Sequence, residues 1–251
     1  MSDEPATTFA RHLMAELGSA LKRDLLAVYL YGSVVVGGFD EGVSDIDRLV
    51  VTRHDLDAPA IARIERFHGQ TIEQFPEWND RLELVYVARP TLAHFRDGGG
   101  LGVISPGEPF HIRDGIELWL QNLYLVRETG TALAGPDVRS AIPAISWPEF
   151  LGATRRYAEE VRTRNLRDAA PGARAYAVLT MCRALCTVRS SRPCSKRESA
   201  TWVRDRMPGW APLIDAAVRC RLSRGRVGFA DDESRQAAET LVRALAAAVT
   251  E

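Results

Sequence analysis

The spacing of apolar and polar positions divides the chain into two stretches. In the first, short continuous apolar runs predict buried strands. They alternate with segments that carry an apolar residue about every fourth position, which predicts amphipathic helices. The predicted strands are 26–30, 49–51, 81–87 and one within 103–112. The predicted helices are 8–24, 34–36, 57–75 and 115–128. Strands mixed with helices favour a mixed sheet covered by helices.

The second stretch shows helical periodicity alone. Its predicted helices are 150–166, 173–188, 199–206, 211–221 and 234–249. This pattern is typical of a helical bundle. Three prolines at 136, 143 and 148 mark the boundary between the two stretches. We therefore expect an α+β protein with domains at 1–144 and 145–251, the second of them all-α.

Composition and charge narrow the classes of protein. The chain of 251 residues is 46% hydrophobic and 26% charged, which is typical of a globular protein. No apolar run reaches the roughly 18 residues that a membrane span needs, and acidic residues stand where a signal peptide needs positive charge. We therefore expect a cytoplasmic protein without a membrane partner, and a monomer.

Charge is distributed unevenly between the stretches. Up to Ala144 there are 13 Lys/Arg against 21 Asp/Glu, and from Ile145 there are 19 against 12. Either the two units attract each other, or the basic unit faces an anionic ligand. The positive charge is too diffuse to indicate nucleic-acid binding.

Four cysteines stand at positions 182, 186, 194 and 220. They form no C-x-x-C pair and have no nearby histidine, which argues against a structural zinc site. We expect four free thiols.

Candidate chemistry concentrates after the first strand, which is followed by Gly32 and Ser33. Backbone N–H groups at a Gly-Ser turn that opens a helix form an anion site, so a phosphate could bind there. Asp45 and Asp47 begin the next strand and share one of its faces. Two carboxylates so close oppose folding unless a cation lies between them, and Mg²⁺ suits oxygen ligands.

The run LYGSVVVGGFDEGVSDIDRLVVT resembles the signature of the polymerase-beta-type nucleotidyltransferases. It is most similar to the aminoglycoside adenylyltransferases that modify streptomycin and spectinomycin. The resemblance implies that Gly32, Ser33 and Ser44 hold the triphosphate of ATP. It also implies that Asp45 and Asp47 bind two Mg²⁺ ions.

The resemblance extends to two further residues. Glu83 is the one acid inside the third predicted strand, where the family carries a third carboxylate that completes the metal site or acts as general base. Lys196 matches a lysine that reaches the nucleotide phosphates, although a loop lysine is by default a solvated charge. Arg48 departs from the family pattern, which has an apolar residue there. It faces away from Asp45 and Asp47 and needs an acidic partner or a path to solvent.

The resemblance implies transfer of AMP from ATP to a hydroxyl of a small molecule, an aminocyclitol such as spectinomycin. The family binds its cationic drugs with acids near the start of the central helix of the second domain. Here residues 166–174 contain Asp168 as the only acid. Two alternatives therefore stay open: another hydroxyl compound or a protein as acceptor, and a nucleotide-binding regulatory module without catalysis. Three retained carboxylates disfavour the second alternative.

Overall fold

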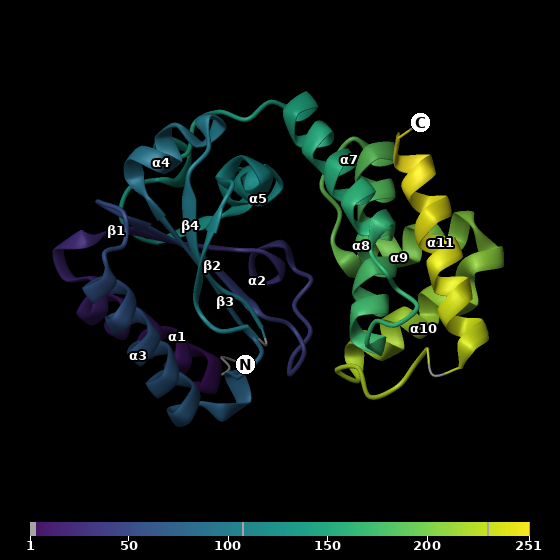
Figure 1. The fold of residues 1–251 in the computed structure, drawn as a ribbon, viewed down its shortest axis with the longest axis horizontal. Coiled ribbons are helices and arrows are strands. Elements are labelled where there is room, and N and C mark those ends of the chain that lie inside the picture. The colour runs from purple at the N-terminus through teal and green to yellow at the C-terminus, as the bar shows by residue number, and fades with distance from the viewer. Residues whose placement is uncertain (1–3, 107, 230, 251) are drawn as a thin grey trace. The chain divides into compact units, whose positions relative to one another are not determined.

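A computed structural model of the protein describes residues 4–106, 108–229 and 231–250. It contains two compact units (Figure 1). The first holds the residues up to Gly37 together with Ser44–Ala144, and the second holds Gly38–Val43 with Ile145–Glu251. The expected α+β class, with a mixed sheet followed by a helical region, is confirmed.

The first unit is built on a six-stranded sheet with the order β5-β4-β3-β2-β1-β6. The strands are β1 (Leu25–Tyr31), β2 (Ile46–Thr52), β3 (Leu82–Ala88), β4 (Gly100–Ile104), β5 (His111–Asp114) and β6 (Thr131–Ala134). β2 and β3 are parallel, and the other pairs are antiparallel. The apolar runs of β1, β2 and β3 place these strands at the centre, because both faces of a central strand are covered. The single strand expected within 103–112 is instead the pair β4 and β5.

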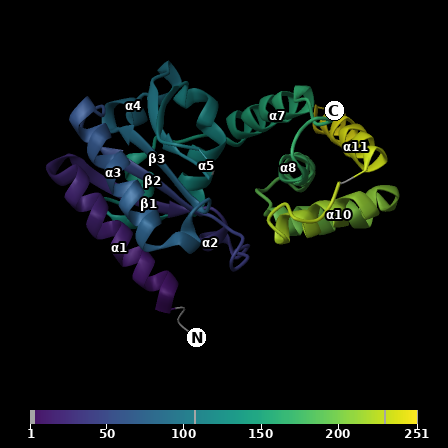
Figure 2. The same ribbon diagram turned by 60° about the horizontal axis from the view of Figure 1, so that its bottom comes forward.

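Helices cover both faces of this sheet. α1 (Glu4–Leu21) and α3 (Ala58–Gln74) lie side by side on one face, and α5 (Leu120–Thr129) lies on the other (Figure 2). The Asp57 side chain caps α3 by accepting a hydrogen bond from the Ala60 amide at 2.8 Å. The remaining helices of the unit are α2 (Ser33–Val36), α4 (Arg89–Ala93) and α6 (Val138–Ala141).

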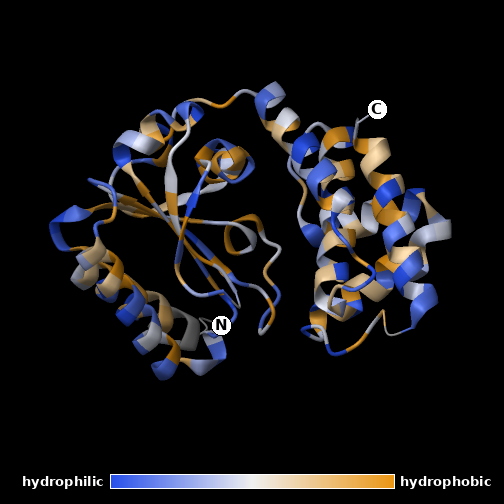
Figure 3. Cartoon of the chain, in the orientation of Figure 1, coloured by the Kyte–Doolittle hydropathy of each residue, from blue (hydrophilic) through white to orange (hydrophobic). Residues whose placement is uncertain are grey.

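The second unit is a helical bundle around α8. Its helices are α7 (Trp147–Thr163), α8 (Pro171–Ser190), α9 (Lys196–Arg206), α10 (Ala211–Leu222) and α11 (Asp232–Thr250). α8 packs against the other four, so it is apolar on more than one side. The outer helices carry apolar residues toward α8 and polar residues away from it (Figure 3). Among the described helices, none is long and apolar enough to cross a membrane.

The expectation of four free thiols is wrong for two of the cysteines. Cys186 and Cys194 form a disulfide with their Cα atoms 6.3 Å apart, while Cys182 and Cys220 are free and buried. α8 ends at Ser190, and the following turn brings Cys194 back beside its last turns. This reversal of the chain cannot be deduced from cysteine spacing alone.

Candidate active site

A tight turn after β1 forms the first part of the site. Gly32 has φ +74° and ψ −152°, a conformation that favours glycine. A Cβ atom at this position would lie 1.9 Å from Oδ2 of Asp47. The turn therefore passes directly against the Asp47 carboxylate, and any larger residue at this position would displace that side chain.

Ser33 follows this turn and opens α2. Its hydroxyl oxygen is buried and makes no hydrogen bond within the described chain. A buried hydroxyl without a partner is costly, so it is a fitting contact for a bound oxyanion.

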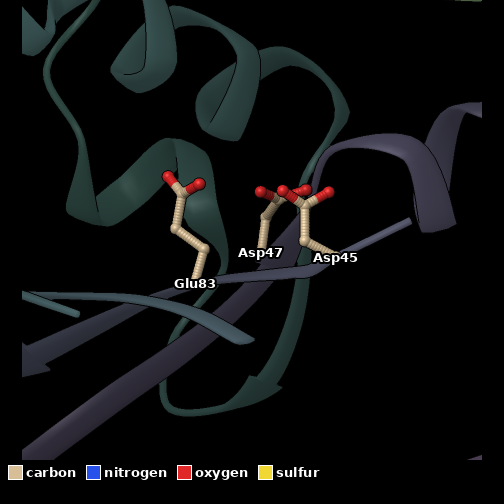
Figure 4. Close-up of side chains that lie close together, drawn as sticks. All are labelled: Asp45, Asp47 and Glu83. Carbon is tan, nitrogen blue, oxygen red and sulfur yellow. The ribbon is translucent and has the colours of Figure 1, made fainter. Parts of the chain in front are cut away.

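Sheet register brings the acidic residues together. Asp47 pairs with Tyr31 of β1 on one side and with Glu83 of β3 on the other. Asp45 immediately precedes β2. The three carboxylates point to the same side of the sheet (Figure 4), and one oxygen from each lies within 4.8 Å of the others. All three are partly exposed, and such a like-charge cluster favours a bound cation.

Tyr31 lies beside these carboxylates and was missed in the sequence. Burial raises the pKa of its phenol well above the ordinary value, and the charges of Glu83, Asp47 and Asp45 raise this pKa further. The phenol therefore stays protonated. Its hydroxyl oxygen is buried and makes no hydrogen bond within the described chain. Strand alternation could have indicated this residue. Tyr31 directly precedes Gly32, and its side chain lies on the face of β1 opposite to that of Leu30.

The opposite face of the sheet holds a buried polar group. Arg48 is 1% exposed, and its Nε and Nη1 atoms make no hydrogen bond within the described chain. Burial lowers its pKa to about 10, and nearby Tyr86 opposes the shift, so Arg48 remains charged at neutral pH. We expected an acidic partner or a path to solvent, and this was wrong: among the described residues Arg48 has neither. The Tyr86 hydroxyl lies 2.9 Å from Nε2 of His68, and burial lowers the pKa of His68 to about 3.

Ser44 supports the segment that leads into Asp45. It is fully buried, and its carbonyl accepts a hydrogen bond from Nε of Arg81 at 3.0 Å. The Arg81 carbonyl in turn accepts from the Ile46 amide at 2.8 Å. Arg81 therefore holds both sides of Asp45 in place.

Lys196 lies in the second unit, as the first residue of α9. Ser195 and Glu198 cap this helix reciprocally, which fixes the backbone at Lys196. Its Nζ atom lies 4.9 Å from the ring centroid of Tyr176. Lys196 also lines a pocket of about 120 Å³ within this unit, together with Arg197, Arg204 and Arg221.

Asp168, the one acid of the expected acceptor region, is exposed in the segment between α7 and α8. Its Oδ2 atom accepts a hydrogen bond from Nδ2 of Asn165 at 2.9 Å. The carboxylate is thus engaged within its own loop.

Comparisons with known proteins bear on both units. Residues 14–90 match the model of the nucleotidyltransferase domain, and residues 153–248 match that of the aminoglycoside adenylyltransferase C-terminal domain. The chain is also similar to the crystal structure of spectinomycin adenyltransferase AAD(9) from Enterococcus faecialis with ATP and spectinomycin. The TM-score is 0.80 at 17% identity, over 98% of this chain and 99% of that chain. At this identity the match shows a shared fold. No curated protein matches the chain.

Proposed function

We propose that the chain, which combines a match to the nucleotidyltransferase domain with a match to the C-terminal domain of the aminoglycoside adenylyltransferases, transfers AMP from ATP to a hydroxyl of a small molecule. The leading acceptor is an aminocyclitol such as spectinomycin. One observation carries the proposal: Asp45, Asp47 and Glu83 converge directly beside the Gly32 turn. We assign nucleotide chemistry to residues 1–144 and acceptor binding to residues 145–251.

The three carboxylates fit Mg²⁺. Their donor set is entirely oxygen, and their ligand atoms lie within 4.8 Å of one another. Asp45 and Asp47 would hold two ions, with Glu83 as a further ligand or as the base. Bound Mg²⁺ supplies charge neutralisation for the attacking and leaving oxygens of a phosphate transfer.

Several residues suit the nucleotide. The unpartnered Ser33 hydroxyl and the backbone of Gly32 would face the β- and γ-phosphates, beside the carboxylates. Lys196 would add a positive charge from the second unit. Ser44, being fully buried, would act behind the nucleotide by holding Asp45.

The acceptor hydroxyl needs a base as it attacks the α-phosphate. Glu83 suits this role because it stands on β3, one strand away from the two aspartates, with the protonated Tyr31 nearby.

Charge argues for spectinomycin over streptomycin. Streptomycin carries more positive groups, while the second unit is basic and its one acid in the expected region is engaged by Asn165. Each missing charge-assisted hydrogen bond costs about 1.5–3 kcal/mol, so two could lower affinity by about a hundredfold or more.

A panel of acceptors incubated with labelled ATP and Mg²⁺ tests this function. We expect labelled product with spectinomycin and little with streptomycin. Strong modification of streptomycin would show that the drug contacts lie elsewhere. Labelling of a protein or of another hydroxyl compound alone would replace the aminocyclitol, and no labelled product at all would contradict the proposal.

A further inference from the structure

Asp40 is a buried acid in the loop that connects α2 with β2. It is 8% exposed, and its two carboxylate oxygens have different partners. Arg197 of α9 donates to Oδ1, and Arg221 of α10 donates to Oδ2. A carboxylate shielded from water and shared by two guanidinium groups is a stronger link than an exposed ion pair.

The loop around Asp40 packs on the start of α9. Residues Gly38–Val43 cluster with the helical unit, although their neighbours on both sides in the sequence belong to the sheet unit. A Cβ atom at Gly38 would lie 3.3 Å from Cβ of Ser195, the residue that caps α9. The backbone of the loop therefore lies against the cap.

This contact reaches the residue proposed to bind phosphate. Lys196 stands between the cap Ser195 and the clamping Arg197. Lys196, Arg197, Arg221 and Asp40 also line the same pocket. The Asp40 link thus fixes the helix start that carries Lys196, and it holds the loop that runs in the sequence from the Gly-Ser turn to Asp45.

We infer that Asp40 is a positioning residue for nucleotide binding: its carboxylate, shared by Arg197 and Arg221, holds the loop 38–43 on the start of α9 and keeps Lys196 in place. This inference rests on the proposed role of Lys196 in AMP transfer. A competing role for Asp40 predicts the opposite change in ATP affinity. If Asp40 occupied two arginines that otherwise bind phosphate, its removal would strengthen ATP binding.

The test compares Asp40→Asn, Arg221→Gln and the double variant by calorimetric titration with ATP and Mg²⁺. Asp40→Asn, which weakens both arginine contacts, is expected to raise the Kd of ATP about tenfold or more. Arg221→Gln, which leaves the Arg197 contact in place, should have a smaller effect. The double variant should be no weaker than Asp40→Asn, because the Arg221 contact is already lost in that variant. Asp40→Glu should restore most of the affinity. Glu41→Gln, at the exposed neighbour in the same loop, should bind ATP as the wild type does.

Amide hydrogen exchange of residues 38–43 gives a second readout that needs no nucleotide. Exchange should quicken in Asp40→Asn and in Arg221→Gln but not in Glu41→Gln. Unchanged exchange, an unchanged ATP Kd or tighter ATP binding in Asp40→Asn would each overturn the inference. Additive losses in the double variant would also overturn it, since Arg221 would then contact the nucleotide itself. If the wild type bound no ATP, the proposed function would fail together with this role; normal wild-type binding with an unaffected Asp40→Asn would refute the positioning role alone.

Discussion

At the scale of single residues, Glu83 differs from the two aspartates in its surroundings. It stands on β3, while Asp47 stands on β2 and Asp45 just before it, and the protonated phenol of Tyr31 lies nearby. These surroundings separate its proposed role as base from the role of the aspartates as metal ligands.

Replacement of Glu83 by Gln is therefore expected to spare the binding of Mg²⁺ and ATP. AMP transfer should fall roughly 100- to 10,000-fold, the usual contribution of a general base. Titration with ATP and single-turnover kinetics measure the two effects separately. If Glu83→Gln loses ATP affinity as completely as Asp47→Asn does, Glu83 is a metal ligand and not the base.

The buried His68 should make the stability of the protein depend on pH. Burial lowers its pKa to about 3, below the unfolded value near 6.5. As the pH falls below 6.5 the unfolded chain takes up a proton that the folded chain refuses, so stability is lost. The loss is up to about 1.4 kcal/mol per pH unit and continues down to the folded pKa. Urea unfolding between pH 6.5 and 5 should show that the free energy of unfolding declines less steeply in His68→Gln than in the wild type.

A matched histidine controls this measurement. His94 is exposed, so His94→Gln should leave the decline as in the wild type. Equal slopes for the wild type and His68→Gln would show that His68 can be protonated in the folded protein.

At the scale of elements, the spacing of apolar residues was sufficient to predict a helix or strand that buries one continuous face. The three central strands and the five helices of the second unit could be predicted because burial sets their apolar spacing. β6 could not, because its four residues lie on the sheet edge and none is fully buried. The proximity of Asp45, Asp47 and Glu83 needs the parallel pairing of β2 with β3, which strand patterns alone do not establish. The resemblance implied only that Glu83 joins the two aspartates.

The turn after β1 should tolerate alanine at Gly37 better than at Gly32. Gly32 and Gly37 have nearly the same φ, +74° and +77°. Their ψ angles differ: Gly37, with ψ 22°, is in the left-handed helical region, whereas Gly32, with ψ −152°, is in a conformation that strains an alanine more. A Cβ atom at Gly32 meets Asp47, whereas one at Gly37 meets nothing within 4 Å. Gly37→Ala should therefore cost only the backbone strain of about 1–2 kcal/mol. Gly32→Ala should lose more stability and should abolish AMP transfer.

Chemical unfolding of both variants, with activity measured alongside, checks this difference. Equal losses of stability with activity retained in Gly32→Ala would mean that Asp47 can move away from the turn without consequence.

At the scale of the whole molecule, the acidic cluster couples stability to the metal. Without Mg²⁺, Asp47→Asn should melt at the same temperature as the wild type or slightly higher, because one of three repelling charges is removed. Mg²⁺ should raise the melting temperature of the wild type and not that of Asp47→Asn. Asp55→Asn, at an exposed acid of the same unit, should keep the wild-type response. A clear loss of melting temperature in Asp47→Asn without metal would contradict a metal cluster.

Contacts distant in sequence were the least predictable feature of the molecule. The ion pairs of Asp40 with Arg197 and Arg221 join residues 157 and 181 positions apart. Each residue alone is an ordinary polar position, and only the folded chain shows that the acid is buried. The same holds for Arg48, whose burial contradicts the default expectation for an arginine.

Nucleotidyl transfer is tested most directly by ATP that carries its label either at the α-phosphate or at the γ-phosphate, incubated with Mg²⁺ and spectinomycin. We expect the α-label in the spectinomycin product and the γ-label in released pyrophosphate, and neither with Asp47→Asn. Transfer of the γ-label to the acceptor would show phosphoryl transfer instead, and would contradict the assignment of AMP transfer to the site formed by Asp45, Asp47 and Glu83.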